Sequence, residues 1–425
     1  MGNEIRNAEM SGSPSFSRTP ARLWPLIACL YVSQGIPFGL AMEAMPASLR
    51  HAGTDLQALA WLPLVGLPWV LKWLWAPWVD NHWSPRTGRR RSWILPMQGL
   101  VLAALLAVAL LGLSAQTLPW ILGLAVTASL ASATQDVATD ALVAEQFATE
   151  SLPMANAIQV ASTMVGFFYG GPVFLMLYGT LGLTWAIVGL VLPIAASLVL
   201  TLSWREPQAL EVAARTRKAS QWHFLRSGRN AWVLVVAACL SAITVVACHG
   251  LGKLLLVDAQ WPLARVGQVG MLGGAFTILV GCGGGAWLVR RFGAWPAFQF
   301  GIASAGLSAV TWAWLATQTP AMPMTAVVMA TVLASIGSGC ASVAIMTAAM
   351  NFCRRRTQAG TDMTMVQSAR DLGETMASSF LIALAARVGY KEGFLLGLGL
   401  AVLTMLATAW MMRSRRARRS PAPGS

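Results

Sequence analysis

The chain has 425 residues, of which 56% are hydrophobic and 11% are charged, whereas soluble proteins average about 25% charged residues. Its formal net charge is +14, but the basic residues are dispersed over short loops and a tail, which argues against the single basic face of a nucleic-acid-binding domain. The composition therefore predicts a multi-pass membrane protein whose positive charges set its topology and contact anionic membrane lipid.

The chain begins with a polar segment, residues 1–21, which is rich in Ser and Pro, and we expect it to form a disordered N-terminus in the cytoplasm. The apolar run that follows is too long for the hydrophobic core of a cleavable signal peptide and has no clear cleavage site. We therefore interpret that run as an uncleaved membrane helix.

Twelve apolar stretches can be marked along the chain, and most reach the roughly 20 residues that a helix needs to cross a bilayer. They lie near residues 23–45, 56–79, 92–113, 118–143, 153–178, 182–204, 230–256, 264–289, 295–316, 321–350, 360–387 and 390–412. The sequence therefore predicts an all-α membrane protein with twelve transmembrane helices.

The basic residues between these stretches gather on alternating sides of the predicted membrane. One side holds both chain ends and most of the 30 lysines and arginines, including the clusters at 89–91 and 354–356. Because positive residues favour the cytoplasmic face of a membrane, this asymmetry predicts that both termini are cytoplasmic. The opposite side holds only Arg50, Arg265, Arg387 and Lys391.

The longest polar interruption within the membrane region is the stretch 205–229, which six apolar stretches precede and six follow. This layout predicts an N-terminal half at 22–204, a basic cytoplasmic linker at 205–229 and a C-terminal half at 230–412. A basic cytoplasmic tail, 413–425, completes the predicted organisation.

A basic cluster follows the second predicted helix, where Asp80 is followed by Gly88-Arg89-Arg90-Arg91, and a degenerate copy lies at 284–293 in the second half. The pattern resembles the loop motif of the major facilitator superfamily. The resemblance implies two parallel-related halves that alternate access to a central site. It also implies a gating loop with six candidate residues. These are Lys72, Asp80, Gly88, Arg89, Arg90 and Arg91. Lys72, at the inner end of the second predicted helix, could pair with Asp80 or Asp136, or could extend its ammonium to the membrane interface.

Two longer blocks carry a narrower resemblance. The block 72–80 with 88–93, and the block 133–141 on the fourth predicted helix, look like the muropeptide-permease branch of that superfamily. The segment 360–368 and the twelve-helix count look like the importers of rhizobactin- and pyochelin-type siderophores. The resemblance implies an importer of a siderophore or ferric siderophore in the bacterial inner membrane. Because the sequence has no nucleotide site but has carboxylates within its predicted helices, we expect the proton gradient to drive import. We expect no cofactor and a monomer. Import of muropeptides is the alternative.

Charged residues inside the predicted helices are candidates for the transport pathway, because an ionisable group in a membrane costs several kcal/mol unless it faces a cavity or a partner. On the fourth helix, Asp136 and Asp140 are four residues apart and share a face. Two nearby carboxylates suit the uptake and release of a proton. The alternative is a gate in which these carboxylates bind the basic loop.

The eleventh predicted helix carries a polar stripe that includes Gln367, Asp371 and Glu374, with Arg370 beside it. A stripe that is polar along its length should line water or a ligand and not lipid. The planar guanidinium of Arg370 could bind an oxyanion of the substrate. The alternative is a structural ion pair with Glu374, four residues away.

Five further candidates lie on other predicted helices. Asn156 and Gln159 could bind neutral groups of a ligand, or could only join helices by hydrogen bonds. His249 could couple protons beside Lys253, or could simply lie at the membrane interface. Glu43 is a candidate for a cavity residue on the first helix.

Other classes of protein have less support in the sequence. The chain contains no GxxxxGK[ST] nucleotide-binding loop, nor a serine elbow, a zinc motif or a CxxC pair. His51 and Asp55 are spaced one residue short of an acyltransferase pair. We therefore expect no enzyme activity and no metal. A membrane acyltransferase and a non-transporting scaffold are the distant alternatives.

Overall fold

The computed structural model describes residues 19–45, 48, 65–114, 116–207, 218–261, 263–354, 356 and 358–417. The chain separates into two compact units, Met1–Phe224 with Ala349–Ser368, and Leu225–Ala348 with Ala369–Ser425. We refer to them as unit 1 and unit 2. The segment Ala349–Ser368 groups with unit 1 although it lies within the predicted half 230–412, and the predicted boundaries of the two halves stay a prediction.

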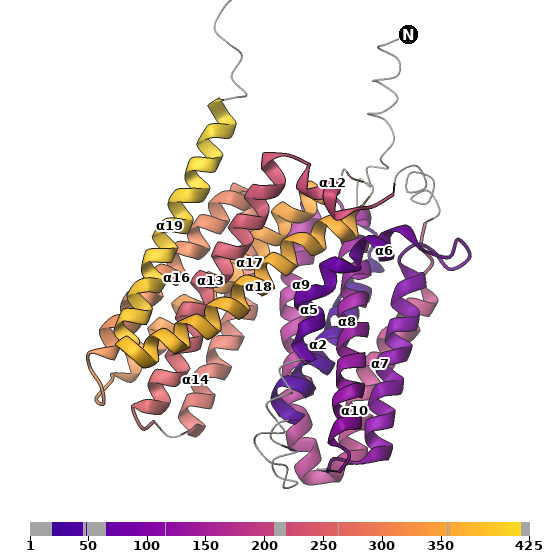
Figure 1. The fold of residues 1–425 in the computed structure, drawn as a ribbon, viewed down its shortest axis with the longest axis horizontal. Coiled ribbons are helices and arrows are strands. Elements are labelled where there is room, and N and C mark those ends of the chain that lie inside the picture. The colour runs from indigo at the N-terminus through magenta and orange to yellow at the C-terminus, as the bar shows by residue number, and fades with distance from the viewer. Residues whose placement is uncertain are drawn as a thin grey trace, which may run out of the picture. The chain divides into compact units, whose positions relative to one another are not determined.

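Unit 1 is built from helices and helical turns (Figure 1). They are α2 (Leu23–Gly39), η1 (Leu40–Ala44), α5 (Leu67–Leu71), η3 (Lys72–Leu74), α6 (Ala76–Asn81), α7 (Arg91–Leu111), α8 (Leu118–Gln146), η4 (Thr149–Ser151), α9 (Leu152–Phe168), η5 (Tyr169–Val173), α10 (Phe174–Ser203) and α12 (Gln221–Leu225), which ends at the boundary with unit 2.

Unit 2 is also helical. It contains α13 (Arg229–Asp258), α14 (Leu263–Phe276), η6 (Thr277–Cys282), α15 (Gly283–Phe292), α16 (Ala294–Ala316), α17 (Met324–Cys353), α18 (Ala359–Val388) and α19 (Tyr390–Ala417). The C-terminal end of α17 and the N-terminal end of α18 belong to unit 1, because Ala349–Ser368 groups there.

Eight helical segments among the described residues are long and apolar enough to cross a membrane. One of them, Thr149–Ser203, merges two predicted stretches, and its helix α10 bends at Gly182, whose φ is +82°. The predicted all-α membrane class is confirmed. The count of twelve helices and the cytoplasmic side of both termini stay predictions, and part of the predicted stretch 56–79 lies outside the described residues.

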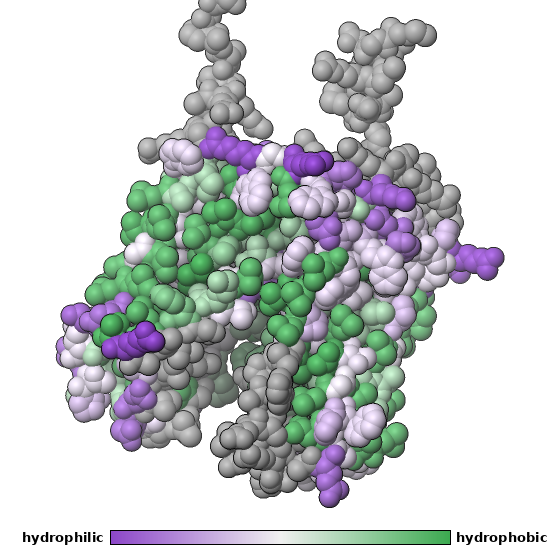
Figure 2. Space-filling model, in the orientation of Figure 1, coloured by the Kyte–Doolittle hydropathy of each residue, from purple (hydrophilic) through white to green (hydrophobic). Residues whose placement is uncertain are grey.

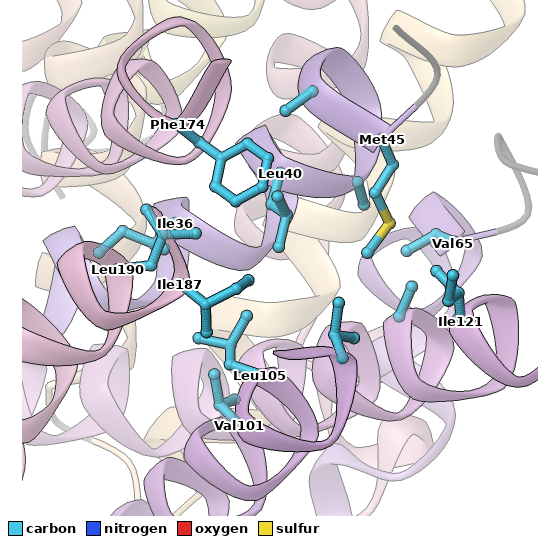
Figure 3. Close-up of a cluster of buried hydrophobic side chains, with 14 of the residues drawn as sticks. Ile36, Leu40, Met45, Val65, Val101, Leu105, Ile121, Phe174, Ile187 and Leu190 are labelled. Atoms are coloured by element: carbon cyan, nitrogen blue, oxygen red, sulfur yellow. The ribbon is translucent and has the colours of Figure 1, made fainter. Parts of the chain in front are cut away.

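The core of unit 1 is an apolar cluster contributed by several of its long helices. Figure 3 shows Ile36 and Leu40, from α2 and η1, beside Leu105 of α7 and Ile187 of α10. All four side chains are at most 3% exposed. Because lipid tails are as apolar as these side chains, van der Waals packing between the helices holds the cluster together.

The outer surface is apolar as well. Leu110 is 89% exposed and Leu279 is 73% exposed, which would be unfavourable in water but suits contact with lipid tails. In Figure 2 the surface along α19 is largely green, in keeping with exposed Val402 and Leu406 on that helix.

Helices α2 and α9 are in direct backbone contact through glycine. A Cβ atom placed on Gly35 would collide with the carbonyl oxygen of Thr163, and one placed on Gly166 would collide with that of Val32. Only residues without a side chain permit this approach. The contact brings the polar residues of α2 and α9 to the same part of the unit.

The second predicted helix is interrupted at the residues that carry its charge. Pro77 has no N–H with which to bond the carbonyl of Trp73, and that carbonyl accepts a hydrogen bond from Gln221 Nε2 at 3.1 Å instead. The chain forms the short 3₁₀ turn η3 (Lys72–Leu74) before α6 begins. The side chain of Lys72 is buried there, with 1% of the residue exposed.

Candidate functional site

A buried ion pair joins η3 to α8 in unit 1. Lys72 Nζ donates to Asp136 Oδ2, and both side chains are at most 6% exposed. Each group would be costly to bury alone, and pairing offsets part of that cost. Asp136 and Lys72 were predicted as a pathway residue and a gating residue, and the structure brings them together.

Asp140, one helical turn further along α8, accepts hydrogen bonds from three elements. The hydroxyl of Tyr31 donates to Oδ1 at 2.7 Å, and Gln159 Nε2 donates to the same oxygen at 2.8 Å. Gln367 Nε2 donates to Oδ2. Asp140 and Tyr31 are both completely buried. The carboxyl group therefore lies where α2, α9 and the N-terminal part of α18 meet α8.

Gln367 connects the ion pair to Asp140. Its Oε1 accepts from Lys72 Nζ at 2.7 Å, while its Nε2 donates to Asp140. The result is one network of six side chains, which we call the Asp140 network. Its members are Tyr31, Lys72, Asp136, Asp140, Gln159 and Gln367. The network holds two carboxyl groups and one ammonium, so one carboxyl group has no compensating cation within it. An excess buried carboxyl group is suited to bind and release a proton.

A second cluster of charged side chains lies at the end of unit 1 that the sequence predicts to face the cytoplasm. Arg90 Nη1 donates to Asp80 Oδ1 at 2.7 Å, and the guanidinium of Arg90 also pairs with Glu145. Arg89 lies 3.1 Å from Glu145 and 3.6 Å from Asp80. The other oxygen of Asp80 accepts from the backbone N–H of Thr361 at 2.6 Å and from its hydroxyl at 2.7 Å. We call this cluster the loop-motif cluster.

Charge controls protonation in the loop-motif cluster. Burial raises the pKa of Asp80, but the charges of Arg90 and Arg89 outweigh it, so that the pKa of Asp80 lies below its usual value. Burial lowers the pKa of Arg90, but Glu145 and Asp80 raise it above the usual value. Asp80 and Arg90 therefore stay charged near neutral pH.

Gly88 and Arg91 have structural roles beside this cluster. Glu206 Oε2 accepts from the backbone N–H groups of Arg90 and Arg91, which start α7, at 2.7 and 3.3 Å. A Cβ atom on Gly88 would lie 2.7 Å from that oxygen, and the φ of Gly88 is +105°. The side chain of Arg91 donates to the carbonyl of Thr201, near the end of α10, at 3.1 Å.

Other predicted residues lie apart from the Asp140 network or belong to unit 2. Asn156 donates to the carbonyl of Leu152 in its own helix at 2.8 Å. In unit 2, Arg370 and Asp371 are partly buried and Glu374 is exposed. Arg370 and Glu374, both described, form no ion pair with each other, so the structural pair considered as an alternative is not formed here.

Three predicted residues cannot be placed. The side chains of Glu43, His249 and Lys253 lie outside the described residues. Their roles stay predictions.

Sequence reasoning missed several members of both clusters. Tyr31 could have been found as a hydroxyl-bearing aromatic residue near Gln34 on one apolar helix, since a buried Tyr hydroxyl needs a partner. Glu145 is a third carboxylate on α8, five residues after Asp140, and therefore had a visible signal. Thr361 donates its own backbone N–H and hydroxyl to Asp80, and Glu206 accepts from the backbone N–H of Arg90. No local pattern marks such contacts between distant segments.

The sequence and the fold both match known membrane transporters. The family model of the Major Facilitator Superfamily matches residues 23–378. The chain is 28% identical over 296 residues to the anhydromuropeptide permease of Escherichia coli strain K12, an alignment that covers 68% of this chain and 60% of that relative. The chain therefore spans less than two thirds of the length of this curated relative.

Solved structures show the same fold at low sequence identity. A bacterial homologue of the iron transporter ferroportin, in an outward-facing state with soaked iron, matches with a TM-score of 0.71 and 15% identity, covering 92% of this chain and 99% of that one. The human organic anion transporter MFSD10 matches with a TM-score of 0.71 and 16% identity, covering 92% of this chain and all of the other. At these identities the likeness establishes the fold alone.

Proposed function

This chain belongs to the Major Facilitator Superfamily, whose family model covers residues 23–378, and from this premise we propose that it imports muropeptides across the bacterial inner membrane in symport with protons. As in the superfamily, transport proceeds by alternating access. We further propose that the halves 22–204 and 230–412 rock around a central site, and that the protein acts as a monomer.

One observation supports the substrate class. The relative aligned over 68% of this chain is named an anhydromuropeptide permease. The blocks at 72–93 and 133–141 pointed to the same branch. Import of siderophores, the main expectation from the sequence, has no comparable support, because the ferroportin homologue shares 15% identity and establishes the fold alone. Muropeptide import, the alternative from the sequence, therefore becomes the proposal.

The Asp140 network supports the choice of the proton as the coupling ion. It contains more carboxyl groups than cations in a buried place, and protonation of one carboxyl group removes the excess negative charge. The sequence also contains no nucleotide-binding loop that could supply energy from ATP. A proton gradient can therefore drive uptake through the Asp140 network.

The loop-motif cluster supports a gating role for the basic loop. Asp80 is bonded both to Arg90 and to the first turn of α18. Opening of the cytoplasmic side would require α18 to leave Asp80, so the strength of this cluster sets how often the transporter changes state.

The proposal is tested with purified protein in liposomes that have an alkaline interior. Radiolabelled anhydromuropeptide should accumulate inside, a protonophore should abolish the accumulation, and Asp140→Asn should abolish accumulation while exchange of substrate across the membrane persists. A ferric siderophore is tested in parallel. Accumulation of the siderophore without the muropeptide, or accumulation of neither, would overturn the proposed substrate class.

A further inference from the structure

The side-chain amide of Gln367 has a fixed orientation between Lys72 and Asp140. An amide presents an oxygen that accepts and an NH₂ group that donates. The ammonium of Lys72 can only donate, so it holds the Gln367 oxygen at 2.7 Å. The NH₂ group must then face Asp140 Oδ2. The amide cannot reverse without placing two donors against each other.

The two oxygens of Asp140 differ in their surroundings. Oδ1 accepts from both Tyr31 and Gln159, whereas the described contact of Oδ2 is with Gln367. A proton that binds Asp140 is therefore expected on Oδ2, where it displaces fewer hydrogen bonds. A protonated Oδ2 presents an O–H donor to the NH₂ group of Gln367, and this contact is lost.

We propose that Gln367 couples the protonation of Asp140 to the docking of the N-terminal part of α18 in unit 1. When Asp140 is ionised, Gln367 bridges it to Lys72, and residues 361–368 are docked. When a proton from water binds Oδ2, the bridge breaks and residues 364–368 are released, while Thr361 stays bonded to Asp80. Loss of that proton to water restores the bridge. Gln367 is thus a positioning residue, since it acts through Asp140.

The other groups around Asp140 are compatible with this switch. Asp136 and Lys72 face it from α8 and η3, and Tyr31 faces it from α2. Cys353, buried at the end of α17, also lies within electrostatic reach. Lys72 is paired with Asp136 in either protonation state, so the release of Gln367 does not leave its ammonium without a partner. Tyr31 continues to donate to Oδ1. Oδ2 is the place where the bonding changes.

The docked segment has few other polar contacts with this region. Thr364 is completely buried, and its hydroxyl has no hydrogen-bond partner among the described residues. Ser368 Oγ is buried without a partner in the same way. Breaking the Gln367 bridge therefore removes a principal polar attachment between α18 and α8. The hydrogen bond from Thr361 to Asp80 remains as the attachment at the first turn of α18.

The inference rests on the proposed proton coupling, but its test needs no substrate. A variant without its native cysteines receives Thr364→Cys, which is buried while the segment is docked. Purified protein in liposomes is reacted with a maleimide between about pH 5 and about pH 9, the range over which buried carboxyl groups titrate. Because a maleimide reacts with the thiolate, the rate at each pH is divided by the rate for a free thiol compound at the same pH. This normalised rate should rise by about tenfold toward acid pH. Its midpoint reports the protonation of Asp140, so Asp140→Asn should make the normalised rate independent of pH.

Substitutions of Gln367 separate coupling from a merely structural role. Gln367→Leu should abolish the pH dependence, whereas a structural role would change the rate by the same factor at every pH. Gln367→Glu keeps an acceptor for Lys72 but places a second carboxyl group against Asp140. The two then dock only when they share a proton, so the pH dependence should reverse.

The matched control is Gln34→Leu. Gln34 is also a buried glutamine bonded to α8, at Thr139 Oγ1 and 3.2 Å, but it does not contact Asp140. This variant should keep the wild-type pH dependence. Persistence of that dependence in Gln367→Leu would overturn the inference even if wild-type protein imports muropeptides. Failure of muropeptide import with a normal labelling profile would overturn only the proposed substrate.

Discussion

The backbone N–H of Thr361 donates to Asp80 Oδ2 at 2.6 Å, which joins two residues 281 positions apart. Thr361 lies in the first turn of α18, where N–H groups have no partner within the helix and the helix dipole is positive. Asp80 thus caps α18 while its other oxygen pairs with Arg90 at 2.7 Å. The basic loop and α18 are attached through one carboxylate.

This attachment predicts that the loop-motif cluster governs conformational exchange and not ligand recognition. Asp80→Asn and Arg89→Ala should slow transport, while equilibrium ligand affinity stays within about threefold, or about 0.7 kcal/mol. Transport rates and equilibrium binding of a labelled muropeptide check this. Arg86→Ala is the control, because Arg86 is exposed in the same loop and should leave both unchanged. A large loss of affinity at a normal exchange rate would contradict the prediction.

The cap also predicts how stability depends on pH. The pKa of Asp80 is below its usual value, so its ionised form stabilises the fold above the usual pKa of about 4, and this contribution is lost only as the pH falls through the lowered value. The difference in Tm between wild type and Asp80→Asn should therefore be constant from about pH 7 to about pH 5 and shrink only below about pH 4. A difference that already shrinks at mildly acid pH would refute it.

The buried pair of Lys72 and Asp136 predicts a compensating double variant. Lys72→Met leaves Asp136 unpaired and should destabilise the protein by about 3–5 kcal/mol. Lys72→Met combined with Asp136→Leu should restore much of the Tm, because no charge is left buried alone, but proton-driven transport should remain lost. Thermal unfolding in detergent and uptake assays measure the two effects. A double variant as unstable as Lys72→Met would show that the unpaired charge of Asp136 does not cause the loss of stability.

Gly88 predicts a difference between two glycine substitutions. Gly88 and Gly112 have positive φ values of +105° and +74°, so alanine strains the backbone at both. A Cβ atom at Gly88 would in addition crowd Glu206, whereas nothing lies within 4 Å of one at Gly112. Gly88→Ala should therefore lower the Tm more than Gly112→Ala, by the equivalent of about 1–3 kcal/mol. Equal effects would mean that Glu206 moves aside freely.

Arg370 allows a direct comparison of its two possible roles. It forms no ion pair with Glu374 in the described structure, so Arg370→Gln combined with Glu374→Gln should not recover the transport that Arg370→Gln loses. If Arg370 binds an anionic group of the substrate, Arg370→Lys should bind poorly, because the bidentate geometry is lost although the charge remains. A double variant that transports normally would remove Arg370 from the substrate site.

The fold class could be predicted from the sequence because lipid imposes it. Long apolar stretches must form helices to satisfy their backbone groups, and the described residues bear this out. The pair Asp136 and Asp140 could be found because a carboxylate on an apolar helix is conspicuous. The polar stripe on α18 was only partly informative. Gln367 from that stripe enters the Asp140 network, whereas exposed Glu374 does not.

The partners of these residues could not be predicted, because they come from distant parts of the chain. The hydrogen bond from Tyr31 to Asp140 joins residues 109 positions apart, and that from Gln367 to Asp140 joins residues 227 positions apart. Helical periodicity places side chains on a face of their own helix but does not say which helix packs there. Lys72 is a partial exception: Asp136 was one of the two partners predicted for it, and the structure shows that pair.

The glycine contact between α2 and α9 has a consequence for the transport cycle. Two helices in backbone contact have no side chains whose rotation could let them slide, so they should move as one rigid body. Tyr31 and Gln159, on these two helices, both donate to Asp140 Oδ1. If the two helices move together, these two hydrogen bonds to one oxygen keep the same geometry in every state of the transporter. The permanent half of the Asp140 site is thus set by residues that have no side chain at all.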